Sequence, residues 1–105
     1  MLLQSHQVDV DCKDSIGHTP LSYAVASWST QIVEMLLQLN VVNVDCKDFR
    51  GRTPLSYAVG EGSMQIVEML LWLDQVDVDC KDSTGQTPLS YAAQGGSMQI
   101  VEMLL

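Results

Sequence analysis

The sequence predicts an all-α-dominated repeat solenoid, in which each unit is a β-hairpin or loop followed by two antiparallel helices. The segment Thr-Pro-Leu-Ser-Tyr-Ala begins at Thr19, Thr53 and Thr87, with a constant period of 34 residues. Two further segments, Asp-Cys-Lys-Asp and Gln-Ile-Val-Glu-Met-Leu-Leu, recur with the same period. Repetition at a period of about 20–50 residues is typical of stacked repeats. The whole chain, 1–105, is therefore predicted to form a single stack.

The first helix of each unit is predicted to begin after a Thr-Pro pair. In the first unit Thr19 is a suitable N-cap, and Pro20 suits the first helical position, where its missing N–H costs no hydrogen bond. This helix is expected to run from about Pro20 to Ala26. In the later units a break is expected at Gly62 or at Gly95-Gly96.

The second helix of each unit is predicted from its apolar spacing. In the first unit Ile32, Val33 and Leu36 fall at helical intervals. A serine that can act as N-cap precedes each copy: Ser29, Ser63 and Ser97. The link that follows, Val-Asp-Val-Asp, alternates like a short strand. Asp48 and Gly51 then favour a tight turn, Asp by bonding to nearby backbone and Gly by adopting a positive φ.

These elements divide the chain into units. Residues 1–10 are predicted to be the tail of a truncated preceding repeat, and 11–44 and 45–78 to be complete repeats. Residues 79–105 are predicted to be a repeat truncated in its second helix.

The pattern of one unit resembles the ankyrin repeat, and the resemblance covers essentially the whole chain. The residues that carry it are Asp48-x-x-Gly51-x-Thr53-Pro54-Leu55, Ala58-x-x-x-Gly62 and Ile66-Val67-x-x-Leu70-Leu71. The Val-Asp-Val-Asp link and the Ser-Tyr-Ala variant are similar to ankyrin arrays of fungal multidomain proteins. The resemblance implies a module that binds a protein partner through its hairpin tips and first helices.

Two positions depart from the family pattern. The family usually has His after Thr-Pro-Leu, where this chain has Ser22, Ser56 and Ser90. A serine hydroxyl can replace the hydrogen bonds of that His only in part. Trp28 stands in the place of Gly62 and Gly96, where a positive φ is expected. Trp28 can be interpreted as drift within a redundant array or as an exposed anchor for a partner.

Composition excludes some classes of partner. The formal net charge is −8, whereas binding to nucleic acid phosphates requires a basic face. No apolar run approaches the roughly 18 residues that span a membrane. The N-terminus has neither the basic region nor the apolar stretch of a signal peptide. The sequence thus predicts an intracellular protein, cytoplasmic or nuclear, that binds neither nucleic acid nor membrane.

Catalytic and metal-binding chemistry is not indicated. Cys12, Cys46 and Cys80 occur once per unit. Equivalent residues of stacked helices lie about 10 Å apart, and a disulfide requires Cα atoms within about 7 Å, so free thiols are predicted. The recurring Asp-Val-Asp segments lack the Gly and Glu of a calcium loop and are predicted to be solvated. No zinc spacing, phosphate loop or catalytic constellation is present, so the chain is predicted to be neither an enzyme nor a cofactor-binding protein.

The predicted partner-binding residues lie at the hairpin tips and first helices, where the units differ most. They are Lys13, Ile16, His18, Trp28, Lys47, Phe49, Arg50, Arg52, Glu61, Lys81, Thr84, Gln86 and Gln94. Phe49 beside Arg50 and Arg52 is the kind of aromatic–arginine cluster that forms binding hot spots. Phe49 could instead fold over its own hairpin. Trp72, after the second helix, could cover the helix end or remain partly exposed.

Two functions are consistent with the sequence. The first is a protein–protein interaction module, part of a larger multidomain protein, whose partner cannot be named from the sequence. The alternative is a structural array segment that self-associates by stacking through its uncapped ends.

Overall fold

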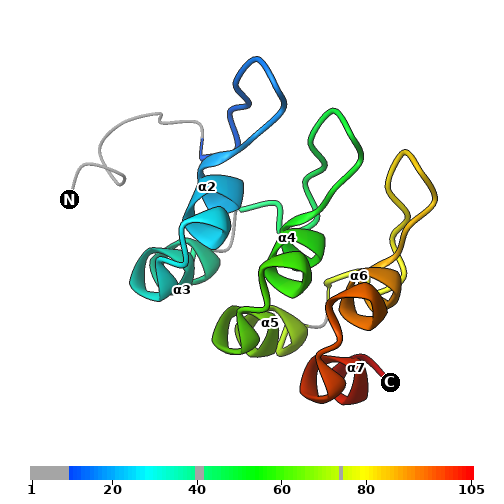
Figure 1. The fold of residues 1–105 in the computed structure, drawn as a ribbon. Coiled ribbons are helices and arrows are strands. Elements are labelled where there is room, and N and C mark those ends of the chain that lie inside the picture. Colours follow the sequence, from blue (N-terminus) through cyan, green and yellow to red (C-terminus); the bar gives the residue numbers. More distant parts are fainter. Residues whose placement is uncertain (1–9, 40–41, 74) are drawn as a thin grey trace.

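The computed structural model describes residues 10–39, 42–73 and 75–105, which form a stack of three helix pairs (Figure 1). The first pair is α2 (Pro20–Ala26) and α3 (Thr30–Leu37). The second is α4 (Pro54–Glu61) and α5 (Met64–Leu71). The third is α6 (Pro88–Gly95) and α7 (Met98–Leu104). The solenoid prediction is confirmed, including the bounds expected for the first helix.

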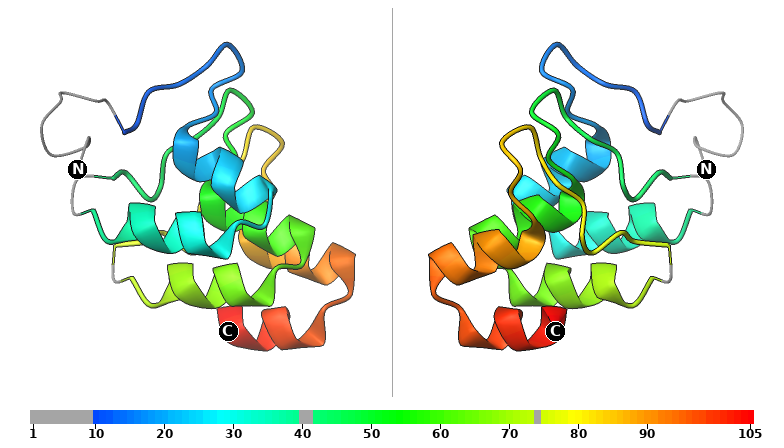
Figure 2. Two further views of the ribbon diagram at one scale, coloured as in Figure 1. Left: turned by 90° about the vertical axis from the view of Figure 1, so that its left-hand side faces the viewer. Right: turned by 90° about the vertical axis from the view of Figure 1, so that its right-hand side faces the viewer.

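The helices form two layers, with α2, α4 and α6 in one and α3, α5 and α7 in the other (Figure 2). Each first helix contacts the next first helix, and the second helices contact one another in the same order. Ala24, Ala58 and Ala92 are buried, which lets the first helices approach closely. The core lies between the layers and includes Leu55 and Ile66 of the middle pair.

Thr-Pro caps begin all three first helices as predicted. The side chain of each threonine accepts the N–H of the serine three residues later, as in Thr53 and Ser56. In turn, the hydroxyls of Ser56 and Ser90 accept the backbone N–H of the capping threonine, which completes a capping box. These two serines therefore stabilise their own helices. The Ser22 hydroxyl also contacts the next unit, 4.0 Å from the Cys46 sulfur.

Serine was predicted to cap all three second helices, and its side chain does so only in α7. Ser97 accepts the N–H of Ile100, whereas Ser29 and Ser63 precede α3 and α5 without a side-chain capping bond. Ser63 and Ser97 have the same neighbours in sequence, and their backbones differ slightly, with ψ of 88° at Ser63 and 99° at Ser97.

The strand predicted from the Val-Asp-Val-Asp alternation is wrong, because no strand forms in the described ranges. Instead, an aspartate of each unit accepts a backbone N–H from the link of the following unit. Asp45 accepts the N–H of Asp77 at 3.1 and 3.2 Å, and Asp11 accepts the N–H of Asn43 at 3.0 and 3.2 Å. Asp11 and Asp45 are half-buried rather than solvated. Backbone groups that a strand would pair are thus bonded by side chains.

Glycines let the loops before the first helices approach one another. Gly17 has φ +87°, and a Cβ there would lie 2.7 Å from the Phe49 nitrogen. Gly51 has φ +77°, and a Cβ there would lie 3.0 Å from the Ser83 nitrogen. Contacts this short exclude a larger residue unless the loops separate. The predicted preceding-repeat tail, 1–10, lies almost entirely outside the described residues, and the unit boundaries stay predictions.

Candidate functional site

The three loops stand side by side along one edge of the stack (Figure 1). We call residues 13–18, 47–52 and 81–86 the loop face. The Phe49 N–H donates to the Ile16 carbonyl at 3.3 Å, and the Ser83 N–H donates to the Arg50 carbonyl at 2.8 Å. These bonds hold neighbouring loops in register, so that their side chains form one surface.

A cleft of about 250 Å³ lies between the first two loops. It is lined by Ile16, His18, Asp48, Phe49, Arg50 and Arg52. Phe49 is 69% exposed and Ile16 is 54% exposed. The Phe49 ring lies beside Gly17, since a Cβ on that glycine would be 2.9 Å from ring atom Cδ1. Phe49 therefore contacts the preceding loop and still presents most of its surface to a partner.

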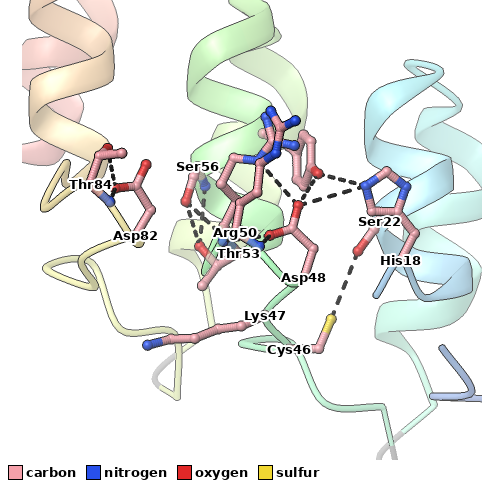
Figure 3. Close-up of polar contacts among 12 residues, drawn as sticks. His18, Ser22, Cys46, Lys47, Asp48, Arg50, Thr53, Ser56, Asp82 and Thr84 are labelled. Carbon is pink, nitrogen blue, oxygen red and sulfur yellow. Dashed lines mark hydrogen bonds and ion pairs between the residues drawn. The ribbon is translucent and has the colours of Figure 1, made fainter. Parts of the chain in front are cut away.

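Asp48 forms the floor of this cleft, with its side chain only 1% exposed. Its Oδ1 accepts the backbone N–H groups of Arg50 and Arg52, each at 2.9 Å (Figure 3). Its Oδ2 accepts the Arg52 Nε at 3.1 Å and the Tyr57 hydroxyl. His18 reaches in from the preceding loop, with Nε2 2.7 Å from the Tyr57 hydroxyl and 3.7 Å from Asp48 Oδ2. The network thus connects two repeats.

The two arginines of the cleft have different roles. The Arg52 guanidinium is bonded to Asp48 and lies over the Tyr57 ring at 4.7 Å. It is therefore already engaged within the protein, although the sequence grouped it with Arg50 as a contact residue. The Arg50 side chain is exposed. Arg50 and Phe49 are the members of the predicted hot spot that are best placed to touch a partner.

An Asp–Tyr pair recurs in every repeat, and the sequence reasoning missed it. The tyrosine hydroxyl of each first helix donates to the aspartate at the start of its own loop: Tyr23 to Asp14, Tyr57 to Asp48 and Tyr91 to Asp82. The signal was available, because the two residues stand nine positions apart in all three copies. The pair braces each loop against its helix.

These bonds shift the pKa values of both partners. Burial raises the pKa of the Asp48 carboxyl, but hydrogen bonds from Tyr57, Arg52 and Arg50 outweigh it and leave the pKa below its usual range. Hydrogen bonds from Tyr91 and Gln86 lower the pKa of Asp82, and those from Tyr23 and His18 lower the pKa of Asp14. Burial and the bond to Asp82 raise the pKa of Tyr91 to about 12.

Acid is expected to destabilise the fold through these aspartates. The pKa values of Asp14, Asp48 and Asp82 lie below the ordinary 3.8 in the folded chain. A depressed pKa contributes stability that is present above the unfolded pKa and lost as pH falls through the folded one. Asp45 acts in the opposite direction, because burial raises its pKa. Urea denaturation from neutral to strongly acidic pH should show the net loss, and Tyr57→Phe should reduce its size. A free energy of unfolding that stays constant below the ordinary aspartate pKa would contradict this prediction.

Trp28 has the positive φ that its position predicts, at 61°. Its indole Nε1 donates to Glu61 Oε1 at 3.1 Å, while 53% of the side chain stays exposed. The ring thus bridges the ends of two first helices, in addition to standing at the surface. Trp28 and Glu61 are brought together, although they were predicted separately.

The remaining predicted residues are not gathered into the cleft. Lys13 Nζ donates to the Lys47 carbonyl at 2.9 Å, which ties the first loop to the second. Thr84 bonds to Asp82 through its N–H and its hydroxyl, and the Gln86 N–H bonds to the same carboxylate. Lys81 and Gln94 are exposed on the third repeat. The third loop therefore extends the loop face.

Cysteines and acidic side chains are the other groups with possible chemistry in the described part of the chain. All three cysteines are free, with Cys12 exposed and Cys46 and Cys80 buried. Within residues 10–39, 42–73 and 75–105, no group of three His, Cys, Asp or Glu side chains is arranged to hold a metal. No helix described by the structure is long and apolar enough to cross a membrane.

Comparison with known families agrees with this architecture. A family model described as ankyrin repeats (3 copies) matches residues 1–82, and one described as ankyrin repeat matches residues 84–105. No curated protein matches the sequence. The chain belongs to the ankyrin repeat family, whose members are generally non-catalytic scaffolds for protein interaction.

Proposed function

We propose that this chain is an intracellular interaction module that binds a protein partner through its loop face and the adjoining first helices. The observation that carries the proposal is the cleft between the first two loops. It combines exposed Phe49 and Ile16 with the cationic side chain of Arg50. Large apolar side chains beside arginine are characteristic of the residues that dominate interface energies.

Rigid support for the exposed residues strengthens this proposal. Phe49 and Arg50 sit in a loop whose ends are bonded to Asp48 and whose tip is bonded to both neighbouring loops. A contact residue held in place loses less conformational entropy on binding. The loop face is thus organised before a partner arrives.

Phe49→Ala is expected to weaken binding of a partner isolated with the wild-type chain by more than about 1 kcal/mol, or at least about fivefold in Kd. The fold should be unchanged, because the ring is 69% exposed. Isothermal titration would measure the affinity, and circular dichroism would monitor the fold. Ser15→Ala is the matched control, since Ser15 holds the same position in the first loop. Equal affinities for both variants would place the interface elsewhere.

A second candidate function, self-association, is favoured by the outer faces of the first and third repeats. Ile32 is 51% exposed and Leu89 is 39% exposed, whereas their counterparts Ile66 and Leu55 are 0% and 1% exposed. Either a second copy or a further repeat would cover such faces. Sedimentation over a range of protein concentration distinguishes a monomeric module from a chain that stacks on copies of itself.

A further inference from the structure

The second helices carry a surface that the loop face does not explain. Trp72 is the C-cap of α5 and is 81% exposed. Of the two interpretations of the sequence, the exposed Trp72 is therefore the one found, rather than a Trp72 that covers the helix end. The first repeat has Gln38 at the same position, as the C-cap of α3. An aromatic side chain so exposed has no evident role in packing this fold.

Trp72 stands between two shallow grooves. One, of about 280 Å³, is lined by Glu34, Leu37, Gln38, Met69, Trp72 and Leu73. The other, of about 340 Å³, is lined by Glu68, Leu71, Trp72 and Met103. Together with Trp72, leucine and methionine side chains form most of both linings, and methionine adapts readily to different apolar ligands. Trp72 is thus an apolar ridge with an apolar groove on either side.

The charge of this face has one sign. Glu34, Glu68 and Glu102 are the charged residues of α3, α5 and α7, one per helix in the same register. All three are exposed. All five basic residues of the chain, Lys13, Lys47, Arg50, Arg52 and Lys81, lie instead on the loop face. We call Trp72, the two grooves and the three glutamates the second-helix face.

The spacing of the glutamates indicates the geometry of a fitting partner. The second helices lie side by side (Figure 2), and neighbouring packed helices are about 8–10 Å apart. Equivalent glutamates on successive helices therefore recur at about this interval. Side chains seven residues apart on an α-helix are about 10.5 Å apart and lie on nearly the same face.

We propose that the second-helix face binds an amphipathic basic helix of a partner protein. The lysine or arginine side chains of that helix recur about every seven residues opposite Glu34, Glu68 and Glu102. Its apolar side chains occupy the grooves on either side of Trp72. This interaction is separate from the loop face, so a partner could engage one face without the other.

The probe for this proposal is a synthetic helical peptide with lysine at every seventh position and leucine along the same face. Binding is followed by tryptophan fluorescence in the full chain carrying Trp28→Gly, which leaves Trp72 as its sole tryptophan. Glycine suits position 28 because Gly62 and Gly96 adopt φ of 74° and 73° at equivalent positions. The peptide is expected to shift the Trp72 emission to shorter wavelength as the indole leaves water.

Two variants and two controls test which feature of the face is responsible. Trp72→Gln, the residue of the first repeat, is expected to weaken the peptide at least about tenfold in Kd, measured by titration calorimetry. Glu68→Lys should weaken it more than Asp79→Lys, which makes the same change in net charge away from the face. Phe49→Ala should leave the affinity unchanged, whether or not the loop face binds a partner.

Several results would overturn the proposal. An unchanged Trp72 emission, or unchanged affinity for Trp72→Gln, would show that the peptide does not lie on this face. Equal losses for Glu68→Lys and Asp79→Lys would reduce the interaction to net charge alone. An emission shift that follows protein concentration without peptide would assign the face to a second copy of the chain.

Discussion

Ile66→Ala is expected to lower the free energy of unfolding by about 2–5 kcal/mol, the usual cost of a cavity left by a buried isoleucine. Ile66 lies in α5, is 0% exposed and belongs to the core between the helix layers. In a repeat stack each unit is stabilised largely by its neighbours, and the middle unit has one on each side. A cavity there weakens contacts with both.

Ile32→Ala is the matched control, because Ile32 has the same position in α3. With 51% of its side chain exposed, its removal should cost only about 1 kcal/mol or less. Urea denaturation followed by circular dichroism measures both variants. Losses of equal size would mean that Ile32 is packed as closely as Ile66 in solution.

Asp48→Ala is expected to lower the free energy of unfolding by about 3 kcal/mol, because it removes one partner of a buried charged network. Two backbone N–H groups, the Arg52 guanidinium and the Tyr57 hydroxyl all donate to this carboxylate. Its loss leaves these donors without their acceptor and removes the contact between Asp48 and His18. Thermal or urea unfolding of the variant measures the cost.

Asp14→Ala is the control for that experiment. Asp14 accepts corresponding bonds from Ile16, His18 and Tyr23 but lies at an exposed position. Water can replace its bonds, so the loss should be clearly smaller than at Asp48. If the two variants lost equal stability, the backbone and tyrosine bonds that both aspartates accept would account for the effect, and the contributions of Arg52 and His18 would be negligible.

Local features of this protein could be predicted from the sequence because they depend on residues a few positions apart. Thr19 and Pro20 begin α2 where expected, and the turn at Trp28 has its expected positive φ of 61°. The free cysteines were also predicted from the repeat spacing. Each of these features follows from the period, from a cap or from the backbone preference of one residue.

The site depended on contacts that the sequence pattern does not encode. Asp48 Oδ2 lies 3.7 Å from the Nε2 of His18, which belongs to the preceding loop. Arg52 was expected to be a contact residue, but the carboxylate beneath it holds its guanidinium. Neither outcome follows from a single unit.

The sequence by itself determined the repeat, the helix starts and the chemistry that is available at each loop. Only the tertiary structure decided which of three equivalent positions is buried, exposed or bonded, as Ile32 and Ile66 show. It likewise placed Phe49 beside Gly17 and left Trp72 between two grooves. The physical reason is that helix capping and turn formation act within one unit. Burial and hydrogen bonding at the surface of a repeat depend instead on which side chains the neighbouring units present.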